Sequence, residues 1–212
     1  QEQMDGLLIV PLEKNKIYSL LKPFLTKIPV ISLTMQLHSD IPHVGTDYHR
    51  QGRIVANILS YCLREGESLV ILDNGDDKLS TQDYLNGFLE RISEEKLDIL
   101  GPYRCHGIQE SVDLLKDLSS KKKIRAVFSN RYAQNIIREL PDSWFLEKNI
   151  VVNGMSEGIQ QLLLEKKVIA TVTEEVYEEA AFAGKLLFQI VQKQFCIKIK
   201  KFKKCGVKQT PK

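Results

Sequence analysis

Short apolar runs alternate along this chain with stretches in which apolar residues recur every three or four positions. A short apolar run bounded by Gly, Pro or Asn predicts a buried strand, and the three-to-four spacing predicts a helix with one apolar face. The expected strands are 4–11, 28–33, 66–73, 97–100, 124–128, 149–153, 168–173 and 195–202. The expected helices are 16–25, 47–59, 80–92, 108–118, 131–140, 159–164 and 177–191. This alternation predicts an α/β fold with parallel sheets and helical crossovers.

The composition is that of an ordinary globular protein. Of the 212 residues, 43% are hydrophobic and 27% are charged, which is enough for one large lobe or two small ones. The net charge of +3 is too small to indicate nucleic-acid binding by the whole chain. We find no apolar run of membrane-spanning length, and the first ten residues lack the basic segment of a signal peptide.

The four cysteines indicate a reducing compartment. They form no CxxC pair and have no histidine at metal-binding spacing. Cys62 falls within an apolar helical pattern, so we expect it to be a buried small hydrophobic residue. Reduced thiols predict a cytoplasmic protein.

We find no set of residues that predicts catalysis. The motifs of serine hydrolases, P-loop proteins, zinc peptidases and dinucleotide-binding proteins are absent from the sequence. The paired glutamates at 174–175 and 178–179 precede or open a helix, where the helix dipole favours acidic residues. The lysines at 121–123 follow a predicted helix and are interpreted as a solvated turn. We therefore expect a binding protein rather than an enzyme, with no cofactor and no metal.

The segment 43–59 contains the first candidate binding residue. It leaves a strand, turns at Gly45, and continues as a helix whose first residues include Asp47. A strand followed by a capped helix places the turn at the carboxyl edge of a parallel sheet, where α/β proteins bind ligands. Asp47 can act as the helix N-cap, as a ligand-binding carboxylate, or as both.

The same segment, VGTDYHRQGRIVANIL, resembles the lac-repressor family and the related periplasmic sugar-binding proteins. MDGLLIVP at 4–11 with IPVISL at 28–33 is similar to two neighbouring strands of that family. LSTQDYLNGFLERI at 79–92 and RAVFSNRYAQNIIREL at 125–140 match its second half in register. The resemblance covers roughly residues 4–200 and rests on register rather than on any single motif.

The resemblance implies a periplasmic-binding-protein-like type I fold with two doubly wound parallel-sheet lobes. Residues 1–65 with 173–194 would form the first lobe, and residues 66–172 with 195–212 the second. In that family two β-α units precede the strand at 4–11, and in the repressors a DNA-binding domain comes earlier still. We therefore expect the first lobe to be incomplete, with DNA reached only through a domain absent from this sequence.

The resemblance also implies a ligand site in an interlobe cleft. The family's cleft positions fall on Asp47, Tyr84, Asn130, Met155 or Ser156, and Glu174. Asp47 and Asn130 keep the family's residue types, whereas Tyr84 replaces an arginine, Met155 an aspartate and Glu174 a glutamine. Losing the arginine fork and the aspartate acceptors removes strong hydrogen bonds to hydroxyl pairs. We therefore expect weak or no binding of free hexoses and pentoses, and stacking of the ligand on Tyr84.

The function that the resemblance implies is effector sensing by a cytoplasmic transcriptional regulator. A small, carbohydrate-like effector would shift a lobe-closure equilibrium that an attached DNA-binding domain reads out. We also expect a homodimer, with the helix at 16–25 and the region 50–64 as its candidate surfaces, and no membrane partner. The alternative is a periplasmic solute-binding protein of a transport system.

Overall fold

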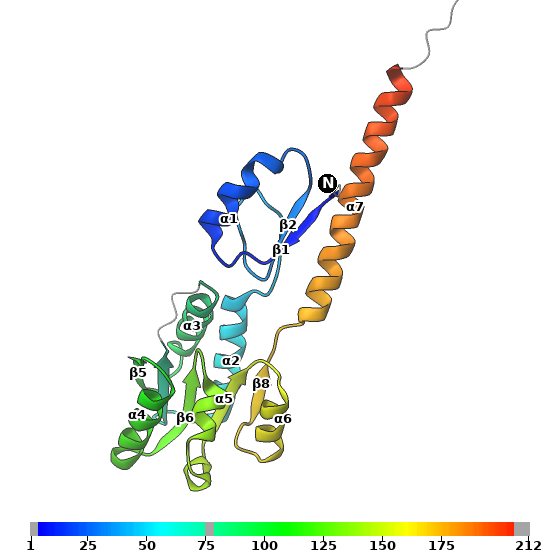
Figure 1. The fold of residues 1–212 in the computed structure, drawn as a ribbon. Coiled ribbons are helices and arrows are strands. Elements are labelled where there is room, and N and C mark those ends of the chain that lie inside the picture. The colour runs from blue at the N-terminus through cyan, green and yellow to red at the C-terminus, as the bar shows by residue number, and fades with distance from the viewer. Residues whose placement is uncertain (1–3, 75–78, 206–212) are drawn as a thin grey trace, which may run out of the picture. The chain divides into compact units, whose positions relative to one another are not determined.

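The computed structural model describes residues 4–74 and 79–205, with side chains described up to Lys193. The chain divides into two compact units, residues 1–46 with 175–212 and residues 47–174 (Figure 1). The division differs from the expected one in two places. The first break follows Thr46 rather than lying near Glu65, and residues 195–205 fall with the first unit, while the rest of the expected segment 195–212 lies outside the described residues.

The first unit contains a parallel sheet in the order β1-β2-β3, formed by Leu7–Ile9, Val30–Leu33 and His43–Val44. Helix α1 (Lys14–Leu21) and the short helix η1 (Lys22–Phe24) connect β1 to β2. Figure 1 shows α1 and the long helix α7 (Val176–Cys205) on opposite sides of these strands. A small core around Val30, Leu37 and Ile41 holds α1 to the sheet.

Helix α7 corrects one prediction. The expected strand 195–202 does not form, because the helix that was predicted at 177–191 continues to Cys205. The alternating apolar and lysine residues at 195–200 have the period of a strand. Extending an existing helix, however, costs far less than starting a new element, and the first glycine after Gly184 is Gly206.

The second unit is a five-stranded parallel sheet in the order β5-β4-β6-β7-β8. The strands are β4 (Ser68–Asp73), β5 (Asp98–Arg104), β6 (Ile124–Ser129), β7 (Asn149–Asn153) and β8 (Ala170–Val172). The helices are α2 (Tyr48–Cys62), α3 (Leu79–Ile92), α4 (Ile108–Lys121), α5 (Ala133–Arg138), η2 (Asp142–Phe145) and α6 (Glu157–Leu164). Both the alternation and the parallel sheets confirm the predicted fold class.

Strand β4, which lies between β5 and β6, is buried on both faces. Leu69 and Ile71 pack in the core beneath α2 and α3, while Val70 and Leu72 face the core beneath α4, α5 and α6. This is the strand period of two, with helices covering each face of the sheet. The second unit is therefore doubly wound, and all its strands end at one edge.

Helix α2 belongs to the second unit because it packs backbone to backbone against α3. A Cβ atom at Gly87 would lie 1.9 Å from the His49 carbonyl oxygen, and one at Gly52 would lie 2.1 Å from the Tyr84 carbonyl oxygen. No side chain fits at either position. This close contact explains why the unit boundary precedes α2 rather than following it.

Candidate functional site

The sheet of the second unit has its switch point between β4 and β6. The chain passes from β4 outward to β5 and then returns to the other side of β4 as β6. In open α/β sheets the helices that follow two such strands go to opposite faces, which leaves a crevice outside the carboxyl ends of the strands. The residues that follow β4 and β6 are therefore the first candidates for ligand binding.

A cluster of buried polar side chains fills this place. The Asn74 backbone N–H donates to Asn130 Oδ1 at 2.9 Å, and Asn74 Nδ2 donates to Ser129 Oγ at 2.8 Å. From helix α4, the Ser111 hydroxyl lies 2.8 Å from Asn74 Oδ1. All four residues are at least nine-tenths buried. Because a buried polar group must be paired, these bonds hold the ends of β4 and β6 in one arrangement.

A charged pair borders this cluster. Asp73 Oδ1 accepts a hydrogen bond from Asn130 Nδ2 at 2.8 Å, and Asp73 Oδ2 lies 3.6 Å from Arg104 Nη1 at the end of β5. The Asn130 amide is thus fixed in orientation by two partners, with its oxygen toward the Asn74 N–H and its nitrogen toward Asp73. One N–H of the Asn130 amide and one lone pair of its oxygen have no bond in this network.

Three further predicted residues lie at the same edge. Met155 and Glu174 follow β7 and β8 by two residues each, and the Met155 side chain is 49% exposed. Asp47 caps helix α2, with Oδ1 accepting from the Arg50 N–H at 2.9 Å. Because α2 leads into β4, its N-terminus lies at the carboxyl edge of the sheet. Ser156, the alternative to Met155, caps α6 by accepting from the Ile159 N–H at 3.2 Å.

Tyr84 does not lie where a ligand could stack on it. Its side chain is 2% exposed and packs in the core beneath α2 and α3, with its ring centroid 5.3 Å from that of Phe128. The expectation of an exposed ring face is therefore corrected. An aromatic ring gains more from burial in this core than a guanidinium would, which explains why tyrosine in this register turns inward.

Two buried polar atoms beneath this edge have no hydrogen-bond partner among the described residues. Gln51 Nε2 donates to Asn153 Oδ1 at 3.0 Å at the end of β7, but Gln51 Oε1 is unpaired. The Tyr84 hydroxyl is also unpaired, and burial raises its pKa. Both atoms belong to the helices that pack over the carboxyl half of the sheet. An unpaired buried polar atom lowers the stability of the fold unless a water or ligand group pairs with it.

Sequence reasoning missed most of this polar network. The sequence patterns do not single out Asn74, Gln51, Ser111, Ser129 or Asn153 as site residues. A usable signal existed for three of them, because Asn74, Ser129 and Asn153 stand at the ends of buried parallel strands. Gln51 and Ser111 lie on helices, and no local pattern distinguishes them.

The described part of the chain offers no metal site and no membrane span. Among residues 4–74 and 79–205, no group of three or more His, Cys, Asp or Glu side chains is placed to hold a metal ion. No helix in the same ranges is long and apolar enough to cross a membrane. Cys105 is buried, whereas Cys62, which was expected to be buried, is exposed at the end of α2.

Comparison with solved structures identifies the fold. A solute-binding protein of an ABC transporter from Agrobacterium vitis with bound D-fucose superposes with a TM-score of 0.72 at 17% identity. The match covers 90% of this chain and 70% of that one. The fold is that of the periplasmic-binding-protein-like type I proteins. No model of a protein family matches the sequence, and no curated protein matches it.

Other structures of this fold agree. A solute-binding protein from Burkholderia graminis in complex with D-arabinose gives a TM-score of 0.73 at 11% identity, covering 89% of this chain and 70% of that chain. GanP, a glucose-galactose binding protein from Geobacillus stearothermophilus, gives a TM-score of 0.69 at 17% identity. The match covers 90% of this chain and 71% of GanP. At such identities the comparison establishes the fold alone. Each of these relatives is described as a binding protein for a sugar or a transported solute.

Proposed function

We propose that this protein binds a small, sugar-like ligand at the carboxyl edge of the five-stranded sheet. The observation that carries the proposal is the buried Asn74–Asn130 cluster at the switch point, where this architecture binds ligands. A rigid polar cluster of this kind provides fixed donors and acceptors without a cost of ordering them on binding. The sugar-binding proteins that share the fold support the same ligand class.

The available atoms suit hydroxyl groups. Asp47 has one carboxylate oxygen engaged by the Arg50 N–H, and Asn130 retains one donor and one acceptor. A sugar hydroxyl both donates and accepts, so it can bridge an amide and a carboxylate. Met155, which is half exposed, stands where the resembling family has an aspartate that would bind a pair of hydroxyl groups. Its side chain would give the ligand an apolar contact instead. We therefore propose a ligand that is less polar than a free monosaccharide, such as a glycoside.

The favoured role is effector sensing by a cytoplasmic regulator of the lac-repressor type. The sequence resemblance supports it, and so does the exposed free thiol of Cys62, which would be readily oxidised outside the cytoplasm. The alternative, a solute-binding protein for transport, is supported by the three related structures reported above. Cell fractionation separates the two: a regulator is expected in the cytosol, and a transport component outside the inner membrane.

A ligand panel tests the binding proposal. Thermal shift assays with free hexoses, pentoses, disaccharides and glycosides, followed by calorimetry, should give little binding of plain monosaccharides and saturable binding of a glycoside. Asp47→Asn should weaken this binding about tenfold, because asparagine still caps the helix but removes the charge. Asp113→Asn, which removes the same charge from the exposed side of α4, should not. Equal affinities in both variants and the wild type would contradict the proposal.

We also propose that the protein forms a homodimer. Helices α1 and η1 carry Leu20 and Phe24, which are 66% and 49% exposed, on the helical segment predicted as an interface. A two-fold contact would cover this apolar surface in both copies. Sedimentation should show a dimer that Leu20→Lys dissociates. A wild-type monomer at high protein concentration would reject the contact.

A further inference from the structure

A basic pocket lies at the opposite edge of the same sheet. It has a volume of about 420 Å³ and is lined by the end of α4, the start of β6 and the segment between η2 and β7. Its walls carry five cationic side chains against the single carboxylate of Glu147. This volume is in the range of small-molecule sites.

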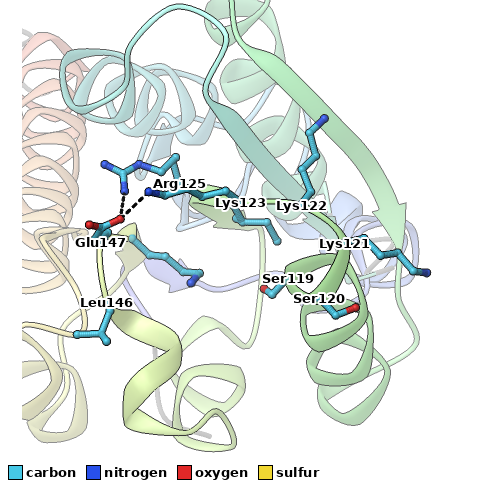
Figure 2. A pocket seen from close by; sticks show the side chains of 10 residues that line it. Ser119, Ser120, Lys121, Lys122, Lys123, Arg125, Leu146 and Glu147 are labelled. Carbon is cyan, nitrogen blue, oxygen red and sulfur yellow. Dashed lines mark hydrogen bonds and ion pairs between the residues drawn. The ribbon is translucent and has the colours of Figure 1, made fainter.

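The cations divide into two groups. Lys121 pairs with Asp117 at 2.7 Å, and Lys122 pairs with Asp98. Figure 2 shows both of these lysines pointing away from Glu147. Lys123 and Arg125 instead converge on the one carboxylate of Glu147, each at 2.8 Å, and Arg125 also pairs through Nε with Glu67 at 3.1 Å.

Among the lysines and the arginine that line this pocket, Lys148 has no ion pair with a carboxylate of the described residues. Its ammonium lies 4.5 Å from the centroid of the Trp144 ring, in a half-buried position. Loss of solvent lowers the pKa of this ammonium, the positive charges of Arg125 and Lys123 lower it further, and the negative charge of Glu147 partly opposes them. A half-buried cation held beside other cations is stabilised by any anion that reaches it.

Ser119 adds a neutral donor to the same wall. Its Oγ accepts a hydrogen bond from the Trp144 indole N–H at 2.9 Å, which leaves the hydroxyl proton available. Ammonium, guanidinium and hydroxyl groups then offer several hydrogen-bond donors around one pocket, and the Lys and Arg groups can only donate. A tetrahedral oxyanion, which presents acceptors in all directions and carries up to two charges, complements such a set.

We propose that this pocket binds a phosphate group of a small molecule, held by Lys148, Lys123 and Arg125 with Ser119. The side chain of Glu147, which is 64% exposed, pairs with Lys123 and Arg125 when no ligand is bound. The phosphate group would take the place of this carboxylate. The site is distinct from the proposed sugar-like site, because it lies at the amino edge of β6 rather than the carboxyl edge. Neither site depends on the other.

Tryptophan fluorescence reports on this pocket directly, because Trp144 is the single tryptophan of the chain. The full chain is titrated with inorganic phosphate at constant ionic strength. We expect a saturable change in emission for the wild type. Lys148→Met should weaken phosphate binding about tenfold or more, since a hydrogen bond to a charged group is lost. Lys116→Met, which removes the same charge from an exposed position on α4, should leave the affinity unchanged.

Lys148→Met also alters the surroundings of Trp144, so a second variant and a second method are needed. Lys123→Gln leaves the tryptophan contacts intact and should weaken binding as well, and calorimetry should give the same affinities as fluorescence. Circular dichroism confirms that the variants fold. The proposal is overturned if phosphate gives no saturable signal with the folded wild type, or if Lys116→Met weakens binding as much as Lys148→Met.

Discussion

Substitution of Gly87 by alanine should strongly destabilise the second unit. The new Cβ would lie 1.9 Å from the His49 carbonyl oxygen, about 1.5 Å closer than the 3.4 Å at which ordinary contacts begin. The obstacle is backbone on helix α2, so α2 and α3 must move apart and open the core around Phe88. Overpacking of this kind costs about 3 kcal/mol, while the better helix propensity of alanine returns about 1 kcal/mol.

The expected net loss is about 2 kcal/mol or more, which corresponds to roughly 6–10 °C in Tm for a unit of this size. Denaturant unfolding followed by Trp144 fluorescence measures it, because Trp144 lies in the core of this unit. Asn86→Ala is the matched control, since Asn86 is the exposed neighbour on the same helix and should change stability by less than about 0.5 kcal/mol. A Gly87→Ala protein as stable as Asn86→Ala would refute the backbone contact.

The other predictions concern buried and charged groups of the same unit. Tyr84→Phe should raise stability by about 1 kcal/mol in denaturant unfolding, because it removes an unpaired buried hydroxyl; a clear loss would show that the hydroxyl has a partner. Asn74→Ala should lower stability by about 2 kcal/mol, since it leaves Ser111 and Ser129 without their shared partner. Hydrogen bonds from Lys122 and Ser68 lower the pKa of Asp98 in the folded protein. The ionised Asp98 therefore adds to the free energy of unfolding at neutral pH, and this stabilisation is lost as the pH falls below about 3.8. Unfolding curves of Asp98→Asn should accordingly lose part of the acid dependence seen in the wild type, and unchanged curves would contradict this assignment.

The fold class was predictable because it depends on periodicity. Runs such as 68–73 and 149–153 are buried on both faces, and their apolar residues need no tertiary information to be recognised. The unit boundary was not predictable. The apolar face of α2 shows that the helix packs, but not on which sheet. The close contact of α2 with α3 at Gly52 and Gly87 decides it. Alignment with the resembling family does not predict this contact between α2 and α3 either.

The candidate site was predictable only in part. Asn130, Met155, Glu174 and Asp47 follow strands or cap a helix at one edge, and the register with the resembling family places them there. Tyr84 occupies the position at which the resembling family has an arginine that would reach a ligand. The tyrosine ring is instead buried in the core, where it is more stable than in water. This burial depends on residues far along the chain, such as Phe128, and is therefore not visible in the local sequence. The end of helix α7 was also not predictable from the local pattern. Residues 195–200 have the apolar period of a strand, but the preceding helix continues through them.

The most direct test of the account is a nuclear magnetic resonance titration of the whole chain with the glycoside that binds best in the panel. The largest shifts are expected in the amide signals of Asn74, Asn130 and Asn153, whose side chains lie at the carboxyl edge of the sheet. Signals from the opposite edge, such as those of Ser119 and Lys123, should stay unchanged. Shifts confined to that opposite edge, or no shift with any member of the panel, would contradict binding of a sugar-like ligand at the switch point.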